Sequence, residues 1–366
     1  MDTKVIKIKK EAIEDGLLLE AAETIRQGGL VAFPTETVYG LGANALNEEA
    51  AKKIYAAKGR PSDNPLIAHI ARAQDLLPLV KEIPEAGKKL MDAYWPGPLT
   101  MIFPKSDLVP YGTTGGLDTV AVRMPSDPIA NRLIELAGVP IAAPSANTSG
   151  RPSPTMAEHV YQDMNGRIEM ILDGGPVGIG VESTIVDVSG PVPVMLRPGA
   201  ITIEMLRETV GEVEIDPVIL GPVSKDIKPK APGMKYRHYA PKAELILVED
   251  GKTAGEQTGG EKAASDAVIR TIRRLAQEKM DQGLRVGIIC TDETESQYPA
   301  GMVRSLGVRS KEETIAHNLF AVLREFDDLQ ADCIFSESFS KDHLGQAIMN
   351  RLTKAAGYHI VYADED

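Results

Sequence analysis

The sequence predicts an α/β protein of two domains, and three observations support this prediction. The chain has 366 residues, which exceeds the size at which a single hydrophobic core usually stops growing. Short apolar runs alternate with helical stretches along most of its length. Residues 211–242, which are rich in Pro, Gly and Lys, interrupt this pattern. We therefore predict a first domain at 1–210, a linker at 211–242 and a smaller second domain at 243–366.

The first domain is predicted to be a twisted mixed sheet covered by helices. Helical spacing of apolar residues predicts helices at 47–59, 85–95, 128–138 and 155–166. Apolar runs predict strands at 30–34, 65–70, 99–104, 119–125, 139–146, 168–174, 183–189 and 194–199. The last three strands follow one another without a helix, which indicates a partly antiparallel sheet and not a strict βαβ ladder.

The second domain shows a more regular alternation. Strands are predicted at 243–249, 284–290, 331–338 and 358–362, with helices at 263–280, 312–329 and 344–357. This order is typical of a small Rossmann-like open parallel sheet.

Composition and charge exclude several classes of function. The net charge of -12 does not favour a chain that coats nucleic acid or an anionic membrane. The only cysteines, Cys290 and Cys333, lie in short apolar runs, so a disulfide framework or a cysteine zinc site is not expected. No signal-peptide core and no run of eighteen apolar residues occurs, and we expect a cytoplasmic protein.

Two motifs near the start of the first domain offer polar side chains at the ends of elements. "FPTETVYGLG", residues 33–42, places Thr35 and Thr37 after a buried strand and before glycines, which suits close approach to a ligand. A plain exit from strand to loop is the alternative. "AAKGRPSDNPLIAHI", residues 56–70, ends a helix at Lys58, caps it with Gly59 and continues with Arg60. Lys58 and Arg60 resemble a preorganised anion clamp. The alternative is that Lys58 merely complements the helix dipole.

A lone arginine lies within the apolar strand "TVAVRMP", residues 119–125. Alternation places Val120 and Val122 on one face and Arg123 on the other. Arg123 either extends to water at an edge or meets a buried anion, and the sequence leaves both possibilities open.

The segment "APSANTSGRPSPT", residues 143–155 and called the signature loop below, leaves a strand with Ser145, Asn147 and Ser153. Thr155 is predicted to cap the following helix. Such loops bind phosphate through hydroxyls and backbone amides, and simple turn chemistry is the alternative. The motifs together offer several hydroxyls and cations but no obvious dyad of nucleophile and general base, which suits the positioning of a triphosphate. No metal site formed by the protein is predicted.

Five motifs together resemble one family. They are "FPTETVYGLG", "KGR", "SAN", "RPGAIT" and "PGMKYRHYAP". As a set they resemble the threonylcarbamoyl-adenylate synthases of the YrdC-like superfamily, in the longer form with two domains. The resemblance implies synthesis of threonylcarbamoyl-AMP and pyrophosphate from L-threonine, bicarbonate or CO2, and ATP, with Mg2+ accompanying ATP. It also implies that the product passes to a tRNA threonylcarbamoyl transferase complex, which modifies the adenosine at position 37 of tRNA. A weak contact with tRNA is a further expectation.

The resemblance also implies roles for individual residues. The residues carried over as catalytic are Lys58, Arg60, Ser145 and Asn147. The implied threonine contacts are Thr37, Thr35, His69, Arg123, Ala143 and Ser183, and the sequence does not decide between the two threonines. The implied ATP contacts are Lys58, Arg60, Asn64, Thr119, Ser145, Ser153, Arg197, Tyr236 and His238.

The segment "APGMKYRHYAP", residues 231–241, is either an ordinary linker or part of the site. Solvated linkers rarely carry aromatic residues, and we predict that this one folds over the nucleotide as a lid through Tyr236 or His238. Two other functions compete with the synthase. One is a module that binds double-stranded RNA or tRNA without catalysis, which the acidic composition disfavours. The other is the carbamoyl transfer of hydrogenase-maturation enzymes, whose cysteine motifs this chain lacks.

Overall fold

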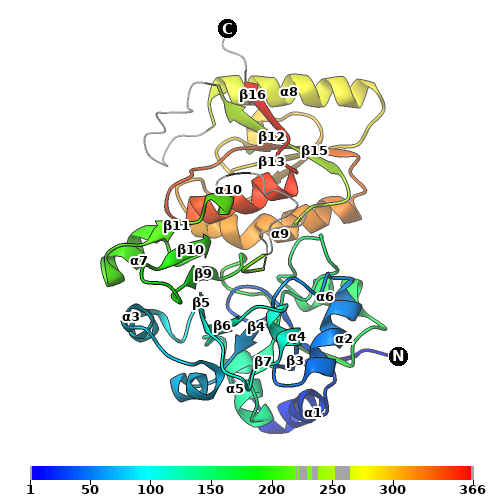
Figure 1. Ribbon diagram of the computed structural model, residues 1–366. Coiled ribbons are helices and arrows are strands. Elements are labelled where there is room, and N and C mark those ends of the chain that lie inside the picture. Colours follow the sequence, from blue (N-terminus) through cyan, green and yellow to red (C-terminus); the bar gives the residue numbers. More distant parts are fainter. Residues whose placement is uncertain (1, 220, 222–228, 233–237, 252–263, 364–366) are drawn as a thin grey trace. The chain divides into compact units, whose positions relative to one another are not determined.

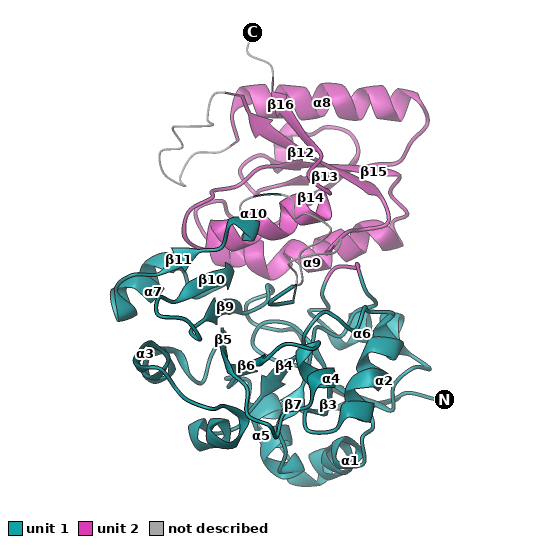
Figure 2. Ribbon diagram, in the orientation of Figure 1, with its two compact units in different colours: residues 1–149, 153–236 teal, residues 150–152, 237–366 magenta. Residues whose placement is uncertain are grey.

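The computed structural model describes residues 2–219, 221, 229–232, 238–251 and 264–363. The chain divides into two compact units, coloured separately in Figure 2. The first unit comprises residues 1–149 and 153–236, and the second comprises residues 150–152 and 237–366. Part of the predicted linker, including Tyr236, lies outside the described residues.

The first unit is built on a mixed sheet of eleven strands in the order β1-β8-β2-β3-β7-β4-β6-β5-β9-β10-β11. Parallel and antiparallel pairs both occur, as predicted. The strands are β1 (Lys4–Lys7), β2 (Val31–Phe33), β3 (Gly40–Asn44), β4 (Ile67–His69), β5 (Leu99–Pro104), β6 (Thr119–Arg123), β7 (Ile141–Ala142), β8 (Met170–Asp173), β9 (Thr184–Asp187), β10 (Val194–Arg197) and β11 (Glu214–Ile215).

Helices cover both faces of this sheet (Figure 1). Leu18, Ile25 and Leu133, from α1 and α5, pack with Phe33 on one face, and the larger core cluster lies on the other. The helical elements are α1 (Asp15–Arg26), α2 (Glu48–Lys58), η1 (Ala73–Leu79), α3 (Glu85–Tyr94), α4 (Tyr111–Thr114), α5 (Pro128–Ala137), α6 (Ala157–Met164), α7 (Ile203–Val210) and η2 (Pro217–Ile219).

Two local features of the first unit differ from the prediction. Gly40 and Gly42 lie within β3, and a Cβ on Gly42 would approach the Phe33 ring to 2.7 Å. Gly42 therefore makes room for core packing and not for a ligand. Helix α6 has Met156 at its N-cap, so Thr155 does not cap it; instead, the Thr155 amide donates to Nδ1 of His159 at 3.3 Å.

The second unit holds a sheet of five strands in the order β14-β13-β15-β12-β16, which is parallel, as predicted, and includes one strand, β14, that the sequence did not predict. Helix α8 lies on one face of the sheet, and α9 and α10 lie on the other (Figure 1). The elements are β12 (Glu244–Asp250), α8 (Asp266–Asp281), β13 (Val286–Cys290), η3 (Glu295–Gln297), β14 (Met302–Ser305), α9 (Glu312–Asp328), β15 (Cys333–Glu337), α10 (His343–Ala355) and β16 (Ile360–Ala363).

Candidate functional site

The predicted threonine-binding side chains gather around Arg123. Arg123 ends β6, beside His69 of β4 and Thr100 of β5 in the strand register. Its Nη1 donates to Thr37 Oγ1 at 2.9 Å, and its Nη2 forms an ion pair with Glu36 at 2.6 Å. Residues opposite one another on paired strands point to the same face. The strand ends therefore bring these side chains together.

The ion pair decides between the two possibilities that the sequence left open for Arg123. The arginine is 4% exposed and meets a buried anion, which is the carboxylate of Glu36. Burial by itself would raise the pKa of Glu36, but the charge and hydrogen bond of Arg123 outweigh burial and lower it. Glu36 is therefore a carboxylate at neutral pH. Sequence reasoning assigned no role to Glu36, although it lies between Thr35 and Thr37.

The imidazole of His69 is held in one tautomer. Its Nδ1 lies 3.0 Å from the carbonyl oxygen of Ile67 and 3.3 Å from that of Ile141. Because carbonyl oxygens only accept, Nδ1 carries the proton and Nε2 is an acceptor. Burial, followed by the positive charge of Arg123, lowers the pKa of His69 to about 3. His69 can therefore accept a hydrogen bond at neutral pH but is too weakly basic to take up a proton.

The two candidate threonines make different contacts. Thr35 Oγ1 donates to the carbonyl of Val38 at 2.6 Å and accepts from the Val38 amide at 3.2 Å. Thr37 Oγ1 accepts from Arg123 and lies 2.9 Å from Thr35 Oγ1. Thr35 therefore shapes the turn, whereas Thr37 faces the arginine.

Arg123, Glu36, Thr37, His69 and Thr100 are called the Arg123 group below. Ser183 is linked to this group through Thr100, a residue that sequence reasoning missed. The two hydroxyl oxygens are 2.8 Å apart, and Arg197 Nη2 donates to Ser183 Oγ at 3.2 Å. The amide of Ala143 donates to the Ile67 carbonyl at 2.8 Å, which fixes the start of the signature loop beside β4.

Lys58 holds the signature loop from inside. Its side chain is buried, and its Nζ donates to the carbonyl oxygens of Ser145 and Asn147. Ser145 Oγ donates to Asn147 Oδ1 at 2.5 Å, so the loop is also braced internally. Lys58 is the last residue of α2, and the next residue, Gly59, ends the helix in a left-handed conformation with φ of 61°. The lysine therefore does more than complement a helix dipole from solvent.

Arg60 and Asn64 form a second brace after α2. Arg60 Nη2 donates to the carbonyl of Pro65 at 3.2 Å, and Tyr55 Oη donates to the carbonyl of Asn64 at 3.2 Å. The side-chain Oδ1 of Asn64 is buried and accepts no hydrogen bond from any described group. An acceptor of this kind is costly unless a ligand supplies a donor.

The remaining predicted ATP contacts are dispersed. Ser153 Oγ donates to Glu182 Oε1, and Arg197 Nη1 donates to the carbonyl of Pro232 at 3.4 Å. Thr119 pairs with Pro104 at the opposite end of β6 from Arg123, so the structure does not bring it to the Arg123 group. His238 is half-buried in the second unit, and Tyr236 lies outside the described residues.

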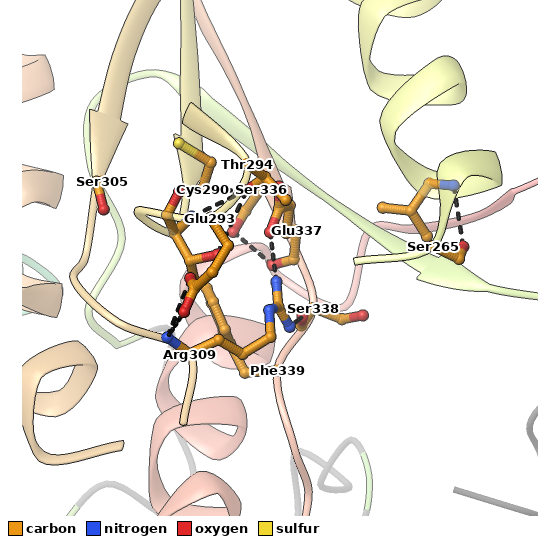
Figure 3. A network of polar contacts seen from close by, with 12 residues as sticks. Ser265, Cys290, Glu293, Thr294, Ser305, Arg309, Ser336, Glu337, Ser338 and Phe339 are labelled. Carbon is orange, nitrogen blue, oxygen red and sulfur yellow. Dashed lines mark hydrogen bonds and ion pairs between the residues drawn. The ribbon is translucent and has the colours of Figure 1, made fainter. Parts of the chain in front are cut away.

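A second polar cluster lies at the carboxyl ends of β13 and β15 (Figure 3). Glu337 is fully buried, accepts from Tyr298 Oη at 2.8 Å and pairs with Arg309. Arg309 Nη1 also donates to the carbonyl of Ser338 at 2.9 Å, and its guanidinium carbon lies 5.1 Å from the centre of the Phe339 ring. Ligands of open α/β sheets often bind at this edge. Here Arg309 and Glu337 form an ion pair with each other, and Nε of Arg309 has no hydrogen-bond acceptor among the described residues.

Among the described residues, no cluster of three or more His, Cys, Asp or Glu is arranged to hold a metal ion. None of the described helices combines the length and apolar character that crossing a membrane requires.

Two family models match the chain. Residues 23–199 match the model described as "Telomere recombination", and residues 201–357 match "Threonylcarbamoyl-AMP synthase, C-terminal domain". The chain is 51% identical to the threonylcarbamoyl-AMP synthase of Pyrococcus abyssi, over 98% of this chain and 99% of that protein. The chain belongs to the threonylcarbamoyl-AMP synthase family.

Other members of the family agree with this assignment. The threonylcarbamoyl-AMP synthase of Bacillus subtilis is 49% identical over 95% of both chains. The crystal structure of P. abyssi Sua5 complexed with L-threonine matches with a TM-score of 0.90 at 49% identity, covering 99% of this chain and all of that one. The comparisons thus confirm the predicted family and fold class, and they support a synthase and not an RNA-binding module.

Proposed function

We propose that this protein is a threonylcarbamoyl-AMP synthase, which converts L-threonine, bicarbonate or CO2, and ATP into threonylcarbamoyl-AMP and pyrophosphate. Similarity to named synthases over nearly the whole chain carries this proposal, at 51% identity in one relative. The product would supply a tRNA threonylcarbamoyl transferase complex that modifies the adenosine at position 37. We expect the enzyme to act in the cytoplasm, and a weak contact with tRNA remains a further expectation.

Threonine would bind at the Arg123 group. The guanidinium of Arg123, which is fixed by Glu36 and donates to Thr37, is a natural partner for the substrate carboxylate. His69 Nε2 offers an acceptor for the hydroxyl or amine of threonine. Ser183 and Ala143 would complete the site at its two sides, and Thr35 would support it from the turn.

ATP would bind along the signature loop. Lys58 holds the carbonyls of Ser145 and Asn147 in place, which leaves the loop preorganised for the phosphates. Asn64 Oδ1 would accept from a donor of the nucleoside, because it accepts from no described protein group. Arg60, Arg197, Ser153 and Thr119 complete the proposed set of ATP contacts.

The chemistry requires positioning and charge neutralisation. The threonine amine loses a proton and forms a C–N bond to CO2, which gives a carbamate. A carbamate oxygen then forms a bond to the α-phosphorus of ATP, and the bond to the pyrophosphate oxygen breaks. Lys58 and Arg60, which donate to backbone carbonyls around the loop, would stabilise the loop and the negative charge of the phosphates, and no protein nucleophile is needed.

Mg2+ would arrive with ATP. Mg2+ is usually held by substrate phosphates, waters and one or two carboxylates.

The linker would close the site as a lid. Ala231 is fully buried in a cluster with Ile67 and Ala121, and Ala121 shares the Arg123 face of β6. The carbonyl of the next residue, Pro232, accepts from Arg197. These contacts support a linker that returns to the site before residues 233–237, with Tyr236 or His238 touching the nucleotide. A lid would exclude water from a carbamate and a mixed anhydride.

Release of pyrophosphate under substrate omission tests this function. We expect release only when threonine, bicarbonate and ATP are all present, and much less when serine replaces threonine. Arg123→Lys should lose most activity, because lysine cannot maintain the paired contacts of the guanidinium. Equal release in the absence of threonine or bicarbonate would refute the proposal.

A further inference from the structure

One face of helix α9 holds two segments that are far apart in the sequence. Phe320, Arg324 and Asp327 are spaced by four and three residues, so they lie on the same side of the helix. Their partners are residues 150–152 and residues 239–242, which belong to the same compact unit as α9. Phe320, Arg324 and Asp327 are called the α9 anchor below.

The first segment is fixed by paired polar contacts. Arg324 is 1% exposed, and its Nε and Nη2 both donate to the carbonyl oxygen of Pro152, at 3.1 and 2.7 Å. Arg151 Nη2 donates to Asp327 Oδ2 at 3.0 Å, and the Asp327 side chain is 1% exposed. A buried carboxylate with a charged partner fixes geometry more firmly than a surface pair.

The second segment is the end of the linker. The amide of Lys242 donates to the other carboxylate oxygen of Asp327 at 2.7 Å. The ring of Tyr239, whose φ is 65°, stacks on Phe320 at a centroid distance of 5.3 Å. The amide of Ala240 donates to the carbonyl of Gly150 at 2.9 Å, which joins the two segments directly.

We propose that the α9 anchor is a positioning element for the ATP site, and that Arg151 connects it to the signature loop. Residues 150–152 lie within this loop, three residues after Asn147 and directly before Ser153. The same anchor holds the linker one residue after His238. Helix α9 would thus fix residues 150–152 within the signature loop. This inference rests on the proposed use of ATP.

Arg151→Met is the primary test. The Arg151 side chain is 26% exposed, so its loss should leave the fold intact, while Asp327 loses its charged partner. A loop displaced by about 1 Å can cost a hundredfold in rate, and we expect the KM for ATP to rise roughly tenfold or more. The KM for threonine should change less than about twofold, because strands β4, β5 and β6 hold Arg123 and its neighbours, and residues 150–152 do not.

Arg304→Met is the matched control. Arg304 Nε pairs with Glu325 of the same helix at 2.7 Å and is 34% exposed, but it contacts neither segment in the described ion pairs. The control should leave the KM for ATP unchanged. Arg324→Lys, which keeps the charge but loses the two-donor contact, should act in the same direction as Arg151→Met.

Hydrogen exchange and direct ATP binding provide readouts that do not need catalysis. In Arg151→Met, amide exchange should become faster in residues 147–153 and 239–242, and the Kd for ATP should rise roughly tenfold relative to Arg304→Met. Equal ATP binding and exchange in the two variants would overturn the inference. Faster exchange with unchanged ATP affinity would also overturn it, because the anchor would then not serve the site. Absence of pyrophosphate release by the wild-type protein would instead refute the proposed function, and exchange and ATP binding would still test the anchor.

Discussion

At the residue scale, the carbonyl Oδ1 of Asn64 is buried and accepts no hydrogen bond from the part of the chain that the structure describes. The backbone of Asn64 is held by Tyr55 and Arg60, so its side chain is placed without using its own acceptor. A buried acceptor without a donor costs roughly 1–3 kcal/mol, which is a reason to expect a ligand donor at this position.

The substitution Asn64→Leu tests the contribution of Asn64 to ATP binding separately from its contribution to the stability of the fold. Leucine has a similar shape but no carbonyl, so we expect the free energy of unfolding to stay within about 1 kcal/mol of the wild type. The KM for ATP should rise about tenfold, which corresponds to one lost hydrogen bond. Asn131→Leu is the control, because the Asn131 amide donates to the Ala71 carbonyl at 2.9 Å. The control should lose stability and keep its KM for ATP, and the reverse pattern would contradict the role of Asn64.

His69 gives a prediction for pH. Unfolded histidine titrates near pH 6.5, whereas the folded pKa is about 3 because of burial and Arg123. Between these values the unfolded chain binds more protons, so the free energy of unfolding should fall as the pH falls from about 6.5 toward 3. The contribution of His69 should approach about 1.4 kcal/mol per pH unit. Denaturant titrations should show a shallower pH dependence for His69→Gln, and equal slopes would contradict the assigned neutral state.

The sequence could single out residues that are unusual for their surroundings. Arg123 in an apolar strand and Lys58 at a helix end both proved to be buried and engaged by other parts of the chain. Glu36 and Thr100 gave no such signal, because their roles depend on side-chain contacts with Arg123 and Ser183, which lie far from them in the sequence. Sequence alone could not choose between Thr35 and Thr37, since the choice depends on a turn that points one hydroxyl at its own backbone.

At the element scale, elements with strong local signals agree with the prediction. Helix α2 begins at the Asn47 cap and ends at Gly59, as expected from capping chemistry. Strand β6 places Val120 and Val122 in one cluster and Ala121 in another, which confirms the alternation that isolates Arg123.

Three of the strands that the sequence did not predict lacked an apolar run or were hidden by glycine. Strands β1 and β14 lie at the edges of their sheets and are only partly buried, so neither carries the pattern of an interior strand. Strand β3 begins with Gly-Leu-Gly, which suggested a loop, but Gly42 is required there by the neighbouring Phe33 ring. The Thr155 cap was wrong because the helix begins at Ala157, after Met156.

At the scale of the whole molecule, the fold class and the family followed from patterns that extend over the full chain. The order of the eleven strands did not, because it depends on pairs such as β1 with β8, whose partners are more than 160 residues apart. The assignment of residues 150–152 to the second unit likewise depends on contacts with α9.

Mass spectrometry of the reaction product tests the central claim most directly. The purified protein is incubated with L-threonine, bicarbonate, ATP and Mg2+, with the carbon of bicarbonate labelled in a parallel reaction. We predict an adduct with the mass of threonylcarbamoyl-AMP, which carries the label and is released with pyrophosphate. Formation of pyrophosphate with an unlabelled threonyl adenylate, or no threonine adduct at all, would contradict the account.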